Sequence, residues 1–269
     1  MTFAATALLA VTLLGGAVHS SNQPSYASGF ADYSEGDFEA AIKTWTQLAD
    51  RGRPEAQYAL GVLYELGHGV AHDYRRAAHW YQKAAAQNYA MAKNNLGMLY
   101  EGGYGVPQNF ASAVDYYRQA AVQGLPSAQY NLALMHYQGL GVAQDFDLAS
   151  NWMLQSAEQG FASAQYNLGI MYQRGEGVAR DDLAAAHWYI EAVKWGAPRA
   201  EANLHSLLQD KDRVVATQAV TVRTQPTDNA STVAELEPGA GFYALRREGE
   251  WVAVVLEDER TIGWISTTR

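Results

Sequence analysis

The 269-residue chain has 48% hydrophobic residues, which allows at least one sizeable buried core and excludes an intrinsically disordered protein. Its formal net charge of -9 is spread along the chain and leaves no basic stripe, which argues against a nucleic-acid partner. The absence of cysteine excludes disulfides, a thiol nucleophile and thiolate metal ligands.

The N-terminal segment, residues 1–20, is typical of a secretory signal peptide. Its apolar core, FAATALLAVTLLGGAV, is uncharged and shorter than the roughly 20 residues of a membrane-spanning helix. No basic residue precedes this core, so an uncleaved N-terminal apolar anchor stays open as an alternative to cleavage after Ser20. We expect an exported protein, periplasmic or secreted, that meets a membrane only if this segment is retained.

A repeat with a step of 36 residues occupies the middle of the chain. Four copies of one motif share a single register: GHGVAHDYRRAAHWY from Gly67, GYGVPQNFASAVDYY from Gly103, GLGVAQDFDLASNWM from Gly139 and GEGVARDDLAAAHWY from Gly175. The pattern predicts full repeats at about 53–88, 89–124, 125–160 and 161–196. A degenerate repeat with a helix over about 37–50 precedes them, and a closing helix over 198–209 follows, so that the repeats span 27–210.

Each repeat reads as two helices joined by a glycine-rich turn. In the first full repeat, Ala56 and Leu60 fall on one apolar helical face, and Gly67 can adopt the left-handed conformation that ends a helix. Asp73 then stands where an N-cap must accept hydrogen bonds from a helix starting at Tyr74, and Asn109 is its equivalent in the second repeat.

The same glycine turns exclude a phosphate-binding loop. Such a loop needs a preceding strand and a G-x-x-x-x-G-K-[ST] or G-x-G-x-x-G pattern, whereas here a helix precedes and no Lys-Ser/Thr pair follows. No other catalytic or metal-binding motif occurs in a recognisable frame. We therefore expect no enzyme, with no catalytic residues, cofactor or metal.

From residue 213 the hydrophobic pattern changes to the alternation of short strands. VVATQAVTVRTQP alternates apolar and polar residues, and Pro226, Pro238, Gly249 and Gly263 mark the breaks between later runs. We expect about five short strands in a separate domain over 213–269.

The repeat is similar to the Sel-1-like repeat, a relative of the tetratricopeptide repeat, in the pattern A-x-x-x-L-G-x-x-Y-x-x-G-x-G-V-x-x-[DN]-x-x-x-A-x-x-W-Y-x-x-A-A. The segments AVTVRTQP, GEWVAVV and GWIS resemble the bacterial Src-homology-3-like domain. The two resemblances imply an α + β multidomain protein: an α-α superhelical solenoid followed by a small all-β Src-homology-3-like barrel. They further imply a scaffold for other proteins and a domain that binds cell-wall peptide or glycan.

Two sets of residues are candidate binding residues. The first is an asparagine column on the first helices, where each amide can donate to and accept from a peptide backbone: Asn95, Asn131, Asn167 and Asn203. The alternative is that these amides tie the helices of the solenoid together. In the barrel, Trp251 and Trp264 are candidates for a ligand groove, with packing in the core as the alternative.

The sequence thus predicts a non-enzymatic adaptor of the bacterial cell envelope. Its solenoid groove would hold a protein or peptide partner, and the barrel would attach it to peptidoglycan. Two alternatives stay open: a pure peptidoglycan-binding module, and an intracellular scaffold with an uncleaved N-terminus. The sequence leaves undetermined the partner, the oligomeric state and whether the barrel has a ligand.

Overall fold

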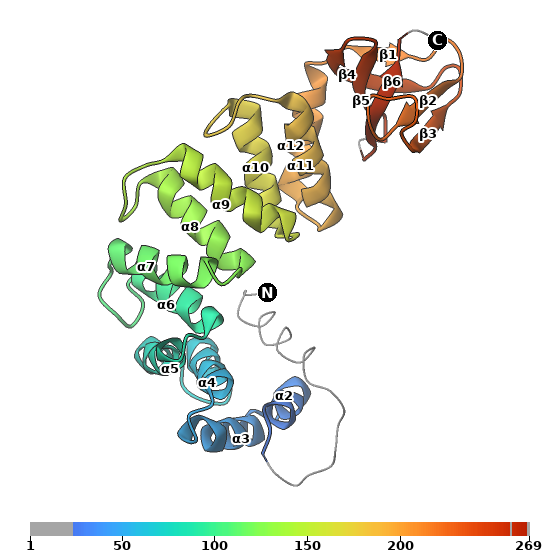
Figure 1. Cartoon of the computed structure of the whole chain (residues 1–269). Coiled ribbons are helices and arrows are strands. Elements are labelled where there is room, and N and C mark those ends of the chain that lie inside the picture. The colour runs from blue at the N-terminus through green and yellow to red at the C-terminus, as the bar shows by residue number, and fades with distance from the viewer. Residues whose placement is uncertain (1–23, 259, 268–269) are drawn as a thin grey trace. The chain divides into compact units, whose positions relative to one another are not determined.

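The computed structural model describes residues 24–258 and 260–267, and in these residues it contains eleven helices followed by six strands (Figure 1). The expected signal segment, residues 1–20, lies outside the described residues. The chain divides into two compact units, one ending at Gln144 and one beginning at Asp145, and each is described by itself.

The first unit consists of helices that pair as the 36-residue period predicts. They are α2 (Tyr26–Glu35), α3 (Phe38–Asp50), α4 (Pro54–Leu66), α5 (Tyr74–Ala86), α6 (Ala90–Gly102), α7 (Phe110–Ala121) and α8 (Pro126–Gln138). Within this unit α4 packs on α5 and α6 packs on α7, and the second helices α3, α5 and α7 pack on the first helices that follow them, α4, α6 and α8. The predicted pair of helices per repeat is therefore confirmed.

The helix ends follow the predicted chemistry. Gly67, which ends α4, has φ 72°, in the left-handed region that favours glycine. Asp73 and Asn109 cap the second helices α5 and α7, with Asn109 accepting a hydrogen bond from the backbone N–H of Ser112 at 3.0 Å. Asn88 is the single non-glycine residue with positive φ among the described residues, and it occupies the position that glycine has in the later repeats.

The second glycine of each turn has a role beyond the turn itself. A Cβ on Gly105 would collide with the backbone carbonyl of Tyr74, which belongs to the second helix of the preceding repeat. Gly141 meets the backbone of Phe110 in the same way. Only glycine therefore lets the turn rest on the neighbouring repeat.

The second unit contains four helices and the sheet. The helices are α9 (Phe146–Glu158), α10 (Ala162–Arg174), α11 (Asp182–Lys194) and α12 (Pro198–Gln209). α10 packs on both α9 and α11, and α12 packs on α11 as the closing helix.

The six strands form one antiparallel sheet in the order β1-β4-β5-β6-β2-β3. They are β1 (Arg213–Val215), β2 (Val220–Arg223), β3 (Thr232–Leu236), β4 (Gly241–Glu248), β5 (Trp251–Leu256) and β6 (Ile262–Ser266). The expected closed barrel is not found, because β1 and β3 stay as the two edges of the sheet and do not pair with each other. A register shift in the β2–β3 pairing breaks the regularity of one edge.

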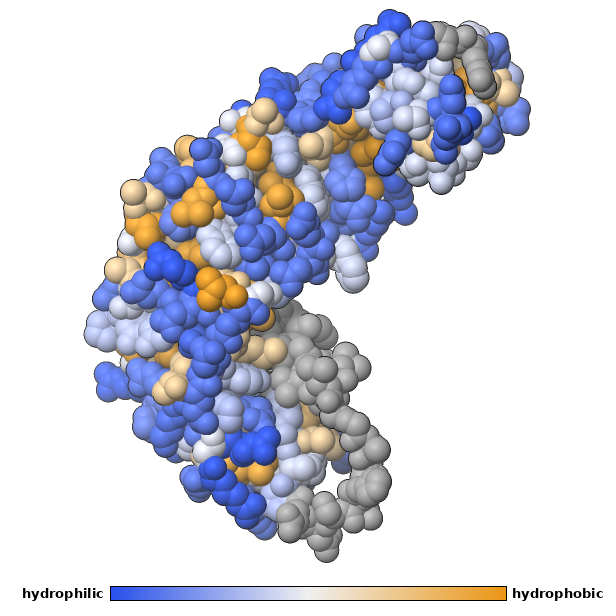
Figure 2. Space-filling view, in the orientation of Figure 1, coloured by the Kyte–Doolittle hydropathy of each residue, from blue (hydrophilic) through white to orange (hydrophobic). Residues whose placement is uncertain are grey.

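The sheet is docked on the last helices. Val255 is fully buried in one cluster with Leu207 and Leu208 of α12, and Tyr243 and Leu245 of β4 pack against this cluster. Charged residues border the junction, where Arg246 donates to Asp181 at 2.6 Å and Lys211 pairs with Asp182. Figure 2 shows apolar side chains beside the strands at this junction.

Candidate functional site

The asparagine column lies on the first helices, as predicted, and its amides have partners inside the protein. Asn95 is nearly buried on α6 and donates from Nδ2 to the Tyr81 hydroxyl at 3.0 Å. Asn203 on α12 donates to the hydroxyls of Tyr166 and Tyr189, both at 3.5 Å. Both asparagines thus contact tyrosines of neighbouring helices.

The two central asparagines are more exposed than Asn95. Asn131 is half-buried on α8 and donates from Nδ2 to the Asn94 Oδ1 at 3.0 Å, which links two successive first helices. Asn167 is also half-buried, on α10, and it too has a partner within the chain. Of the four candidates, Asn131, Asn167 and Asn203 keep part of their surface available to a ligand.

Two of the tyrosines that accept from these amides, Tyr81 and Tyr189, are fully buried, and each donates to a further acceptor. The Tyr81 hydroxyl donates to Glu65 Oε2 at 2.5 Å, and the Tyr189 hydroxyl donates to Gln173 Oε1 at 2.7 Å. Burial raises the pKa of Tyr189 to about 12, so this hydroxyl stays a donor at neutral pH. The chains Asn95–Tyr81–Glu65 and Asn203–Tyr189–Gln173 fix helix positions within and between repeats.

A column of buried glutamines on the first helices, which the sequence analysis did not predict, links these helices to the second helices that precede them. Nε2 of three buried glutamines donates to a backbone carbonyl near the end of the preceding second helix: Gln57 to Ala49 at 3.2 Å, Gln129 to Ala121 at 3.3 Å and Gln165 to Ala157 at 3.1 Å. Each of these carbonyls also accepts from the backbone N–H of the glycine three residues later, so the glutamines add a second donor that comes from the next helix. The 36-residue step would have revealed the column, although Lys93 interrupts it.

Half-exposed apolar residues accompany the central asparagines. On α8 these residues are Tyr130 and Leu134; Leu134 lies at i+3 from Asn131 and at i+4 from Tyr130, so both other residues neighbour it on the helix surface. On α10, Tyr166 and Ile170 have the same relation to Asn167. We call these two sets the α8 face and the α10 face. Each combines an aromatic ring, an aliphatic side chain and an amide.

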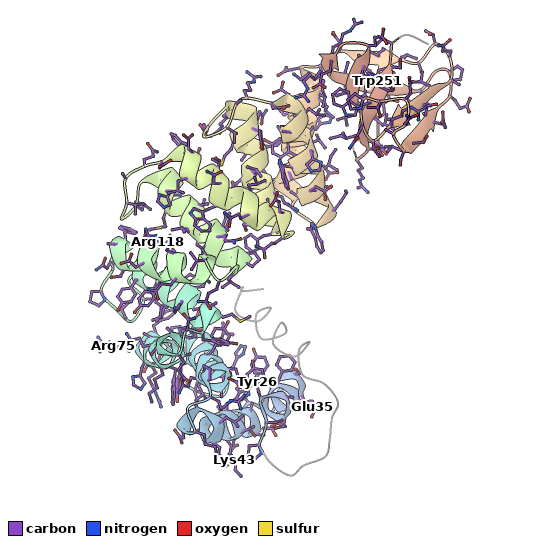
Figure 3. All side chains as sticks on the ribbon, viewed as in Figure 1. Tyr26, Glu35, Lys43, Arg75, Arg118 and Trp251 are labelled. Atoms are coloured by element: carbon purple, nitrogen blue, oxygen red, sulfur yellow. The ribbon has the colours of Figure 1, made fainter. Side chains whose placement is uncertain are left out.

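The two tryptophans of the sheet differ in their surroundings. Trp264 is 8% exposed and forms part of the interior, with the Arg246 guanidinium 5.7 Å above its ring. Trp251, labelled in Figure 3, is half-buried at the start of β5. It lines a surface pocket of about 100 Å³ with Arg223, Asp228 and Thr221. The structure therefore places only Trp251 of this pair at a pocket.

Within the described ranges, no group of three or more His, Asp or Glu side chains is arranged to hold a metal ion. In the same residues, no helix is long and apolar enough to cross a membrane.

Comparison with known proteins identifies the repeats. The family pattern described as Sel1 repeat matches residues 54–89, 90–125, 126–161 and 162–194. A Sel1 repeat protein from Oxalobacter formigenes is 32% identical, with a TM-score of 0.62, over 67% of this chain and 74% of that one. A protective antigen of uropathogenic Escherichia coli strains is 36% identical, with a TM-score of 0.61, over 63% of this chain and 36% of that one. No curated protein matches.

Proposed function

Because this chain belongs to the Sel1 repeat family, we propose that it is a non-enzymatic scaffold that binds a protein partner through the first helices of its repeats. The α8 and α10 faces carry this proposal. Their half-exposed rings and aliphatic side chains can bury apolar side chains of a partner, while Asn131 and Asn167 can bond to its polar groups.

The second helices are poorer candidates for the same role. Many of their apolar residues are buried between helices, as are Ala113 and Tyr117 of α7. Their outward positions include exposed polar residues, such as Gln82 on α5 and Gln119 on α7, together with the exposed Leu148 on α9. The repeated asparagines lie beside half-exposed apolar residues on the first helices, so a partner that needs both apolar contacts and amide hydrogen bonds is better served there.

Site-specific photo-crosslinking in cells tests this function. A photoreactive amino acid at Leu134 or Ile170 should give covalent adducts with a discrete protein. The same amino acid at Gln82 or Gln119 is the matched control and should give none. Equal adducts from both pairs of positions would contradict the assignment of the binding surface.

Alanine substitution asks whether the asparagines themselves contribute to binding. The double variant Asn131→Ala and Asn167→Ala should weaken the crosslink from Leu134, with a smaller effect on the melting temperature than on capture. The double variant Gln82→Ala and Gln119→Ala is the control. A large loss of helicity without a specific loss of capture would assign these amides to the solenoid alone.

We also propose that the scaffold works in the cell envelope, with an Src-homology-3-like module that meets the cell wall. The apolar residues 3–18 support export, and the motifs VTVR, GEWVAVV and GWIS support the module. N-terminal sequencing of the protein recovered from a periplasmic fraction should give a chain that starts near residue 21. A chain in the cytosol that still includes residues 1–20 would favour the intracellular scaffold instead.

A further inference from the structure

The pocket beside Trp251 contains opposite charges that are not paired with each other. It is lined by Arg223 at the end of β2, Asp228 in the loop before β3, Trp251 at the start of β5 and Ser266 at the end of β6. Among the described residues, Arg223 and Asp228 form no ion pair, although both line this pocket of about 100 Å³. A ligand can therefore lie between the two charges.

The guanidinium of Arg223 is held in place by the fold. Its Nη1 donates to the backbone carbonyl of Ala230 at 2.9 Å, which leaves further N–H groups of the same guanidinium to bind a carboxylate. Asp228 is exposed and makes no hydrogen bond or ion pair with the described residues, so its carboxylate can accept from an ammonium group.

The remaining lining sets the size and polarity of the ligand. The half-buried ring of Trp251 offers an apolar surface to aliphatic carbon and an attractive face to a cation. Thr221 is occupied, because its hydroxyl donates to Glu235 at 3.0 Å. A volume of about 100 Å³ corresponds to about three water molecules, so the pocket itself accommodates only a small polar head group.

We propose that this pocket binds the zwitterionic head group of an α-amino acid, in which an ammonium and a carboxylate share one carbon. The ammonium lies at Asp228, the carboxylate lies at Arg223, and the aliphatic part of the ligand rests on Trp251. The same head group occurs on free amino acids and at the ends of diamino-acid side chains in peptides. The inference rests on the sheet module being a ligand-binding module, and it is independent of the protein partner of the helices.

Titration of the full chain with norleucine, followed by NMR, tests the inference. The reporter is the indole N–H signal of Trp251, assigned by its loss in Trp251→Phe. Norleucine should shift this signal and saturate it in the millimolar range, as expected for a small ligand in a small pocket. N-acetylnorleucine lacks the ammonium, norleucine amide lacks the carboxylate, and each should bind at least about tenfold more weakly.

The variant Asp228→Asn should reduce the affinity for norleucine about tenfold and leave the binding of N-acetylnorleucine unchanged. Asp212→Asn, an exposed aspartate outside the pocket, is the matched control and should bind as the natural chain does. Equal binding of norleucine and its two blocked forms would overturn the proposal, and so would unaltered binding by Asp228→Asn.

A second experiment distinguishes the two sources of the head group, free amino acids and peptides of the cell wall. Purified peptidoglycan sacculi should pull down the full chain, and millimolar norleucine should release it if a wall peptide supplies the ligand. Norleucine binding without sedimentation would assign the pocket to free amino acids and would count against the wall-binding function alone. Sedimentation that norleucine does not release would overturn the pocket as the wall-binding site.

Discussion

Individual glycines inside the first helices are matched to aromatic rings. A Cβ on Gly97 would lie 2.5 Å from the Tyr117 ring, and one on Gly61 would collide with the Tyr81 ring in the same way. Both tyrosines are fully buried. Each ring thus occupies the space that a side chain at the glycine position would need. This packing explains why glycine stands inside these helices in spite of its low helix propensity.

The substitution Gly97→Ala should destabilise the protein by about 1–3 kcal/mol, because overpacking outweighs the gain in helix propensity. Combining it with Tyr117→Met should recover part of this loss, since a flexible thioether can leave room for the added methyl group. The third repeat has this combination naturally, with Ala133 and Met153 in the two columns. Chemical denaturation of both single variants and the double variant measures the coupling; strict additivity would contradict it.

The carboxyl group of Glu65 lies in a partly buried environment that disfavours its charged form. Burial raises the pKa of its carboxyl, and this effect outweighs the hydrogen bond from Tyr81 and the nearby His72, which lower the pKa. The folded state therefore binds a proton more readily than the unfolded state. The stability from this proton is present below the unfolded pKa and is lost as the pH rises through the raised folded pKa.

The substitution Glu65→Gln should therefore raise the melting temperature by a few degrees at pH 7 and flatten the pH dependence between the unfolded and the folded pKa. Gln173 already fills the equivalent position in the fourth repeat and accepts from Tyr189 at 2.7 Å. Thermal melts of both proteins at pH 4 and pH 7 provide the measurement. A variant that is less stable at pH 7 would show that the charged hydrogen bond dominates.

The glutamine column links the end of one helix to the start of the next helix. Gln129, near the start of α8, donates to the Ala121 carbonyl at the end of α7, so one side chain links the last turn of one helix to the first turn of the next. The same carbonyl also accepts from the backbone N–H of Gly124 at 2.9 Å, so Gln129 supplies its second donor.

We expect Gln129→Leu to cost about 1 kcal/mol of folding free energy, because a buried hydrogen bond between two helices is lost while the carbonyl keeps its bond from Gly124. The exposed Gln119→Leu on α7 is the control and should change stability by less than about 0.5 kcal/mol. Urea denaturation compares the two. Similar costs would indicate that the hydrogen bond contributes little.

The helices and their caps could be predicted from the sequence because the signals are local and repeated. Gly67, Asp73 and Asn109 each act within one turn of chain, and four copies in one register remove the ambiguity of a single glycine pair. The contact of Gly105 with Tyr74 could not be foreseen, since it joins two repeats through backbone atoms that carry no residue signature.

The sheet was predicted less well, for the same reason. Alternating residues identify strands, but closure into a barrel depends on which edges meet, and no local pattern specifies that.

Of the candidate site, the asparagine column was placed on the correct helices, whereas its tyrosine partners were not predicted. Trp251 and Trp264 occupy similar motifs, and only their opposite tertiary surroundings distinguish them.

On the scale of the whole molecule, the second compact unit includes both helices and sheet. Val255 and Ile262 of the sheet share a core with Leu207 and Leu208, so the sheet covers an apolar side of the closing helix. A solenoid needs such a cover at its end. Deleting residues 213–269 would therefore damage the last repeat as well as remove the sheet.

The substitution Val255→Asp places an uncompensated charge in this core and should cost at least about 3 kcal/mol. Hydrogen exchange should then accelerate in α11 and α12 as well as in the sheet, while amides of α5 and α6, in the other unit, serve as the reference. Val233→Asp, on the exposed edge of the sheet, is the control. Faster exchange confined to the sheet would show that the two parts unfold independently.

The contact between Gly105 and Tyr74 has a consequence for how this chain can be rearranged. The glycine and the helix it touches lie in adjacent sequence repeats, so a repeat cut at the start of a first helix separates them. A segment cut just before each second helix, such as 74–109, keeps both partners in one piece of 36 residues. Shuffling, duplication or transplantation of repeats should therefore succeed more often when the chain is cut just before a second helix than when it is cut at the start of a first helix.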